Sequence, residues 1–391
     1  MHPNYSNLLL DLKDVFIKKI LHLDSSLKIF LETKPKPHTC PCCGNNTVKI
    51  HDYRFQTIKD LPFQLKHAYL VLKKRRYVCS CGKRFLESYY FLPRYHRRTT
   101  RLSFQVIELL RQTSSLKQVA RSSNLSVSTV CRILDTLSYE PTSLPSCLCI
   151  DEFRGNAETG KFQCILVDFK KHQILDILPN RSQVQLTAYF RQYSRTERAK
   201  VKFFICDMWM PYVDLARIFF PNAKIIIDKY HFIRQMTWAI EAVRKRLQKT
   251  MPVSLRKYYK RSRSLILAPY SKLKREQKQA CDLMLLYNDD LRLAHQLKEW
   301  FYHICNTKQY GIQRKDFDDW ISNARGSGIK EFEACARTYC NWRKEILNAF
   351  KYGYTNGVTE GFNNKIKVLK RLSYGIKNFK RFRTRILHTT N

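Results

Sequence analysis

Short apolar runs alternate with turn residues in the middle of the chain. "SCLCIDEF", "KFQCILVDF" and "QILDILP" are three such runs, and this pattern is typical of strands. A helical pattern follows from Val184 to Tyr193, then the strand "VKFFICD". A second helix around Tyr212 to Phe220 leads into the strand "AKIIID". The pattern therefore predicts the order β-β-β-α-β-α-β.

Three meandering strands followed by alternating helices and strands are the order of an RNase H-like α/β fold. We expect this core over residues 145–232, by analogy at the level of the fold. Residues 233–350 are almost wholly helical in pattern, with many basic and aromatic side chains. Residues 351–391 contain "TNGVTEGFNNKIKVLKR", which starts at Thr355 and predicts one further helix.

The chain before the core divides into three segments. Residues 1–36 form a lead-in, in which "NLLLDLKDVFIKKIL" predicts an amphipathic helix and "KPKPH" marks its end. Residues 37–98 hold basic, strand-like sequence between two cysteine clusters. Residues 99–138 are helical, and the proline-containing "SYEPTSLPS" is the best linker in the chain.

The segment 99–138 contains a candidate helix-turn-helix. "SLKQVARSSNLSVSTVCRIL" predicts a first helix with Val119 and Ala120 inside, a turn at Asn124, and a second helix. The apolar positions of the second helix are expected inside: Val127, Val130, Ile133 and Leu134. Its polar positions are then free to reach the edges of bases: Ser126, Ser128, Thr129 and Arg132. An ordinary αα-hairpin is the alternative.

The charge points to a polyanionic partner. Lys plus Arg number 71 and Asp plus Glu number 32, a formal charge of 71 − 32 = +39, which favours DNA or RNA. An anionic membrane surface is the rival, but the sequence has no apolar stretch near 18 residues and no signal segment at its start. Nine cysteines are scattered singly, as in a reducing compartment. We therefore expect a soluble cytoplasmic protein.

Two carboxylates follow apolar strands. Asp151 ends "CLCI" and Asp207 ends "VKFFIC", so both are expected at neighbouring strand ends, where they would repel unless a cation lay between them. Mg²⁺ prefers oxygen ligands, and two such ions can drive an in-line displacement at phosphorus. Each residue alone is equally consistent with a turn at the end of a strand. Glu152 is a possible substitute ligand, but strand alternation directs it to the opposite face.

Glu360 is the candidate third carboxylate. It lies just inside a helix that Thr355, Asn356 and Gly357 are expected to open. One face of this helix carries an acid, an amide and two cations, spaced four, three and four residues apart: Glu360, Asn364, Lys367 and Arg371. Such a stripe suits a phosphodiester backbone. The alternative is that Glu360 is a first-turn acid favoured by the helix dipole.

Five cysteines form the two clusters. Cys40 and Cys43 make a C-x-x-C pair, whereas Cys79 and Cys81 make a tighter C-x-C pair. Four thiolates suit a tetrahedral structural Zn²⁺. The gap between the pairs exceeds the roughly 15–20 residues usual for a zinc ribbon, and Cys42 could replace Cys40. Free thiols are the alternative, and disulfides fit poorly with a reducing compartment.

Nearly the whole chain resembles insertion-sequence transposases of the ISL-three family, within the DDE superfamily. The motifs that carry the resemblance are "CIDEF", "ICDMWMPY", "IIDKYHFIRQ" and "TNGVTEGFNNKIKVLKRLSYGIKNFKRFRTRIL". The resemblance implies an acidic triad of Asp151, Asp207 and Glu360. It matches Asp228 and His231 to the family's D-x-x-H element, although they also suit a strand-end acid and a helix-start histidine.

The resemblance also implies the organisation and the activity. Residues 37–98 would be a zinc-ribbon-like module, and residues 233–350 an insertion that splits the core into 145–232 and 351–391. His231 would contact the scissile phosphate or orient Asp228. The protein would bind its element's ends and the target DNA, and it would cut and join DNA with Mg²⁺ or Mn²⁺. It would act in a bacterial cytoplasm, associated with the nucleoid, as a homodimer or higher oligomer in the DNA complex. A nuclease or resolvase of the same fold, and an inactive DNA-binding regulator, are the alternatives.

Overall fold

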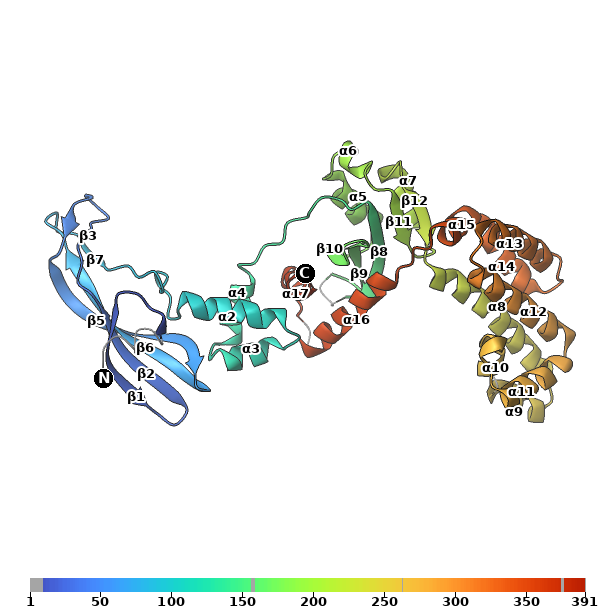
Figure 1. The fold of residues 1–391 in the computed structure, drawn as a ribbon, viewed down its shortest axis with the longest axis horizontal. Coiled ribbons are helices and arrows are strands. Elements are labelled where there is room, and N and C mark those ends of the chain that lie inside the picture. Colours follow the sequence, from blue (N-terminus) through green and yellow to red (C-terminus); the bar gives the residue numbers. More distant parts are fainter. Residues whose placement is uncertain (1–9, 156–158, 262, 374–375, 391) are drawn as a thin grey trace. The chain divides into compact units, whose positions relative to one another are not determined.

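The computed structural model describes residues 10–155, 159–261, 263–373 and 376–390. The chain forms two compact units (Figure 1). Unit 1 comprises Met1–Glu140 together with Lys365–Asn391, and unit 2 comprises Pro141–Asn364. The expected C-terminal segment, residues 351–391, is therefore divided between the two units.

A five-stranded sheet forms the first half of unit 1. Its order is β1-β2-β6-β5, and β7 pairs with β6. The strands β2 and β6 are parallel, and β6 is antiparallel to β5 and β7. Buried leucine and isoleucine side chains of β2, β5 and β6 form its core. The bounds are β1 Val15–His22, β2 Ser26–Thr33, β3 His38–Thr39, β4 Asn46–Thr47, β5 Ile50–Phe63, β6 Lys66–Val78 and β7 Arg84–Leu86.

The helix predicted near the N-terminus is wrong from Val15 onward. Residues 7–9 lie outside the described residues, and Val15–His22 form the strand β1, paired antiparallel with β2. Valine, isoleucine and phenylalanine favour strands, and Val15 is buried in the same core cluster as Leu27 and Leu31 of β2. Because β2 pairs with β6, the lead-in is part of the same sheet as residues 37–98.

Four helices of the described residues lie wholly in unit 1. They are α2 Thr100–Arg111, α3 Leu116–Ser122, α4 Val127–Leu134 and α17 Phe379–Thr390. The turn between α3 and α4 has Asn124 in the left-handed region, with φ of 51°. Val130, Ile133 and Leu134 are buried as predicted, but Val127 is 42% exposed because it begins α4 directly after the turn. The C-terminal helix α17 packs on α2 and α4.

Unit 2 is built on a second five-stranded sheet with the order β10-β9-β8-β11-β12. The meander β8-β9-β10 is antiparallel, and β11 runs parallel to both β8 and β12. This confirms the predicted order of strands and helices. The bounds are β8 Cys147–Arg154, β9 Phe162–Asp168, β10 Gln173–Leu178, α5 Gln183–Arg191, α6 Arg195–Arg198, β11 Phe203–Cys206, α7 Met210–Phe219 and β12 Lys224–Ile227.

A helical region follows β12, as predicted. The long helix α8 packs against α12 and α14, and α15 returns to pack on β12 (Figure 1). The bounds are α8 Lys229–Thr250, α9 Val253–Arg261, α10 Arg263–Leu267, η1 Tyr270–Lys272, α11 Arg275–Leu286, α12 Asp289–Asn306, α13 Tyr310–Arg325, α14 Lys330–Asn341 and α15 Arg343–Tyr352. The next helix, α16 Gly357–Leu372, begins in unit 2 and ends in unit 1. Among the described residues, no helix is long and apolar enough to cross a membrane.

Acid should destabilise this helical region through His295 of α12. Burial and the neighbouring charge of Lys298 lower the pKa of His295 to about 3. The unfolded chain binds a proton near pH 6.5, so stability is fully present above that pH and is lost as pH falls toward 3. We expect a loss of about 2 kcal/mol between pH 7 and pH 5. Urea unfolding at both pH values tests this. Between pH 7 and pH 5, the free energy of unfolding of His295→Gln should fall by about 2 kcal/mol less than that of the parent protein.

Candidate active site and metal centre

Three aspartates lie at one level of the sheet, one within β8 and two directly after β11 and β12. Ile205 of β11 pairs with Cys149 of β8, so continuing this register by two residues places Asp207 level with Asp151. Cys206 pairs with Ile227 of β12, so the next pair along is Asp207 and Asp228. Parallel strands thus bring three carboxylates to one edge of the sheet.

Asp151 is within β8 and does not end it. The strand continues to Arg154 because β9 pairs with it along its whole length, and Asp151 lies opposite Ile165. Burial and the negative charge of Asp207 raise the pKa of Asp151 to about 7. A carboxylate in this position is destabilised, and a cation between Asp151 and Asp207 would relieve it.

The imidazole of His231 pairs with the carboxylate of Asp207, and the contact of His231 with Asp228 is through the backbone. Its Nε2 lies 2.9 Å from Oδ1 of Asp207. Burial lowers the pKa of His231, but the hydrogen bond with Asp207 and the surrounding aspartates outweigh this, so the pKa is raised overall. The expectation that His231 orients Asp228 is not supported, because the helix α8 turns the imidazole toward β11.

Asp228 instead holds two helix starts. Its carboxylate accepts from the backbone N–H of Tyr230, which caps α8, and from that of Asn356 at 2.8 Å. The amide of Asn356 also donates to the carbonyl of Ile150 at 3.4 Å. The start of α16 is thereby attached to the sheet beside Asp151.

Asn363 brings α16 to the candidate site, and the sequence reasoning missed it. Its Nδ2 donates to Oδ2 of Asp151 at 2.8 Å, and the residue is buried. The sequence "EGFNNK" contains two adjacent asparagines, and only Asn364 was assigned to the candidate site from the sequence. Glu360 lies one turn before Asn363 on the same helix.

The structure does not gather the three candidate ligands around one point. Within the described residues, the group of His, Cys, Asp and Glu side chains close enough to share an ion is the cysteine cluster. The side chain of Glu360 is exposed. The other residues of the predicted stripe are also exposed: Asn364, Lys367 and Arg371.

Glu152 is occupied by other partners. Its carboxylate accepts from Arg181 and from the hydroxyl of Tyr212, the latter at 3.2 Å. The guanidinium of Arg181 lies over the rings of Phe162 and Trp209, 4.9 Å and 4.6 Å from their centroids. These contacts turn Glu152 away from Asp151, as strand alternation predicts. Arg181 itself carried no sequence signal.

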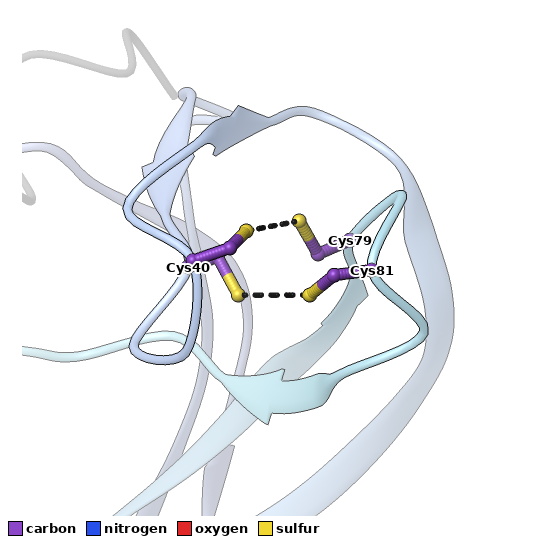
Figure 2. A group of neighbouring side chains, drawn as sticks. Cys40, Cys79 and Cys81 are labelled. Carbon is purple, nitrogen blue, oxygen red and sulfur yellow. Dashed lines mark hydrogen bonds between the residues drawn. The ribbon is translucent and has the colours of Figure 1, made fainter.

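The cysteine cluster has the geometry of a tetrahedral metal site (Figure 2). The sulfurs of Cys40 and Cys81 are 3.7 Å apart, and those of Cys43 and Cys79 are 3.4 Å apart. Thiolates about 2.3 Å from a zinc ion would lie about 3.8 Å from one another. The four residues therefore fit Zn²⁺, and Cys42, exposed and outside the group, does not replace Cys40.

Each cysteine pair is closed by a glycine. Gly44 and Gly82 have φ of 76° and 81°, a conformation that glycine adopts without strain, so the chain folds back and aims backbone amides at the sulfurs. The amide of Cys81 lowers the pKa of Cys79 to about 6. The short C-x-C spacing of the second pair thus still produces a knuckle.

The exposed side of α4 carries the predicted DNA-contacting residues. Ser128 and Arg132 are exposed, and Arg132 donates to the hydroxyl of Thr129 at 3.3 Å. Ser126 has a different local role, because its hydroxyl caps α4 by accepting from the N–H of Thr129 at 3.2 Å.

Comparisons with known families agree with these units. A family model described as a transposase, of the ISL3 family, matches residues 148–386. A model of the zinc-finger of the transposases IS204, IS1001, IS1096 and IS1165 matches residues 36–81. A model of the helix-turn-helix domain of transposase family ISL3 matches residues 87–138.

Individual relatives include two transposases. The chain is 28% identical to the transposase for insertion sequence element IS1001 of Bordetella parapertussis, over 90% of this chain and 89% of that protein. It is 25% identical to the transposase for IS1557 of Mycobacterium tuberculosis, over 56% and 54%. A protein named an ATP-dependent protease from Lactococcus lactis shares 32% identity over 27% of this chain. From the family model that covers most of unit 2, and the relative that covers most of the chain, we conclude that the chain belongs to the ISL3 family of transposases.

Proposed function

We propose that this transposase is of the DDE type, with an RNase H-like core that cleaves DNA strands and transfers them. The observation that carries the proposal is the register that sets Asp207 level with Asp151 at one sheet edge. The meander of three strands followed by two parallel strands supports the RNase H-like assignment. The α16 helix with Glu360 is attached to the same edge through Asn356 and Asn363.

Asp151, Asp207 and Glu360 would hold Mg²⁺ or Mn²⁺. The oxygen donors suit these hard ions, and burial together with the charge of Asp207 raises the pKa of Asp151, so a cation there would stabilise its charged form. Bound ions would activate the attacking hydroxyl and stabilise the leaving oxygen. His231 holds one oxygen of Asp207 by a hydrogen bond, which leaves the other oxygen available as a ligand.

The remaining modules would hold the DNA. Ser128, Thr129 and Arg132 on α4 would contact base edges, whereas the hydroxyl of Ser126 serves the helix cap. Lys367 and Arg371 on α16 would contact phosphates beyond the candidate site. The zinc-ribbon-like module would add backbone contacts through its basic strands.

DNA affinity should depend steeply on salt. The formal charge of +39 supports many phosphate contacts, each of which releases counterions. We expect affinity to fall by about 10³-fold or more between 50 and 200 mM salt. Fluorescence anisotropy with a labelled duplex measures this slope, and a shallow slope would mean that the positive charge is spread over a solvated surface.

The decisive experiment is a cleavage and joining assay. The protein is incubated with Mg²⁺ and a duplex that carries the repeats flanking its gene, and the products are separated on denaturing gels. Nicked strands that become joined to a second duplex support the proposal. Hydrolysis without joining indicates a nuclease or resolvase, and specific binding without any product indicates a regulator.

A further inference from the structure

A small pocket opens beside the candidate active site. Its volume is about 200 Å³, and it is lined by residues of α8, of α14 and the position after it, and of the loop after β11: Met208, His231, Arg234, Gln235, Trp238, Thr338 and Trp342. The helices α8 and α14 pack side by side, so two walls of the pocket are helices that are packed against each other within unit 2 (Figure 1). It is smaller than the roughly 300 Å³ at which most small-molecule sites begin, and so suits a single planar ring system.

One side of the pocket is an exposed aromatic and cationic row on α8. Tyr230 is 63% exposed and Trp238 is 53% exposed, although tryptophan is usually well buried. Between them, the guanidinium of Arg234 lies 4.3 Å from the ring centroid of Trp238 and 6.0 Å from that of Tyr230. The spacing of four residues aligns all three on one helix face. Large exposed rings around a cation are a platform on which nucleobases stack.

The pocket also offers hydrogen-bonding groups. In the described part of the chain, Gln235 has no side-chain hydrogen bond and Arg234 has no carboxylate partner. The hydroxyl of Thr338 donates to the carbonyl of Ala334 at 3.0 Å, which leaves its oxygen able to accept. Trp342 is buried and forms an apolar surface. The amide and the hydroxyl suit the polar edge of a base, and the indole rings suit its face. The cation suits the phosphate of the same nucleotide.

The position of the pocket relates it to the proposed chemistry. Met208 directly follows Asp207, and His231, another lining residue, is 2.9 Å from Asp207. A phosphate held at Asp207 would therefore have its neighbouring nucleotide at the mouth of the pocket. A base that is still paired and stacked in a duplex cannot enter a pocket of this size, so it must first leave the helix.

We propose that this pocket receives one nucleobase that rotates out of the DNA next to the cleaved phosphate, with Trp238 as its stacking partner. The inference rests on the proposed function, because it needs DNA at Asp207. The energy lost by unstacking the base is offset by stacking on Trp238 and by the contact of Arg234 with the phosphate. The pocket would thereby fix the position of the cleaved bond relative to the carboxylates.

The test compares two probes in an Asp151→Asn background, where DNA is not cut. One probe is the duplex that carries the flanking repeat. The other is the same duplex with a single abasic site, placed in turn at each nucleotide near the cleavage point. Trp238→Ala should weaken binding of the intact probe by about fivefold or more. It should leave binding of one abasic probe unchanged, because that probe has no base to stack. Trp238→Phe should retain most of the affinity.

Tyr287→Ala is the matched control, since Tyr287 is a half-exposed aromatic side chain of the same helical region outside the pocket. It should change binding of neither probe. Equal losses with Trp238→Ala on the intact and all abasic probes would overturn the inference, as would no loss at all. Because Trp238 is half-exposed, its truncation does not hollow the core, and circular dichroism checks this.

Failure of the inference can be separated from failure of the proposed function. If the protein cuts and joins ends while Trp238→Ala binds all probes normally, only the pocket assignment is wrong. If the protein neither selects the repeat nor cuts it, a random duplex with one unpaired bulged base replaces the first probe. A preference for the bulged over the paired duplex that depends on Trp238 would then support the pocket alone, and its absence would refute both.

Discussion

Asp151→Asn, Asp207→Asn and Glu360→Gln should each reduce cleavage and joining of DNA ends by about 10³-fold or more. Each change keeps the shape of the side chain and removes the charge that would hold an ion. Losing one ligand disturbs both ions of a coupled site, so a double variant should be no worse than the single variants. The rate of nicking of an end-labelled duplex in Mg²⁺ is the measurement.

DNA binding and folding should survive these substitutions. Removing a negative charge near phosphate leaves the affinity for DNA unchanged or slightly increased. Asp151→Asn should also raise the melting temperature of the metal-free protein at neutral pH, because Asp151 is buried beside the charge of Asp207. Thermal unfolding in EDTA and anisotropy with labelled DNA measure both effects.

Glu152→Gln is the matched control for the triad. Glu152 adjoins Asp151 in β8, but its carboxylate is taken up by Arg181 and Tyr212. An amide can still accept from either partner, so we expect substantial activity. If Glu360→Gln still cut DNA while Glu152→Gln did not, the third ligand would be Glu152, and α16 would serve only to contact phosphates.

Removing zinc should unfold the cysteine end of unit 1. The short strands β3 and β4 have two residues each, too few to persist without the metal that joins their knuckle to the one between β6 and β7. Zinc binding in small modules contributes about 10 kcal/mol or more, so Cys43→Ser or Cys79→Ser should lose the metal and the local fold together. Limited proteolysis within residues 38–86, and affinity for the repeat, are the readouts.

Cys42→Ser is the control, because Cys42 lies outside the cluster and should retain a full equivalent of zinc. Unit 2 should stay folded in every cysteine variant, since its core contains none of these residues. Elemental analysis that finds no zinc in freshly purified protein, or proteolysis that is unchanged by chelation, would contradict the structural role.

The local sequence pattern was sufficient to predict those elements whose residues show a clear hydrophobic period or a recognisable motif. Apolar runs bounded by turns predicted the strands β8 to β12 in their order, because a buried strand needs continuous apolar residues. The two cysteine pairs predicted a metal cluster, and the tertiary structure then selected Cys40 over Cys42 through the positions of the sulfurs. The hairpin of α3 and α4 followed from its helical period and from the turn at Asn124.

Only the tertiary structure decided the features that depend on distant partners. Residues 15–22 have apolar residues compatible with a helix or a strand, and pairing with β2 selected the strand. The contact of Asn363 with Asp151 joins residues more than two hundred positions apart, and the choice of Asp207 over Asp228 as partner of His231 depends on how α8 leaves the sheet. The sequence by itself thus determined which side chains could hold a metal or contact DNA. Their neighbours were set by long-range strand register and helix packing, which no local period encodes.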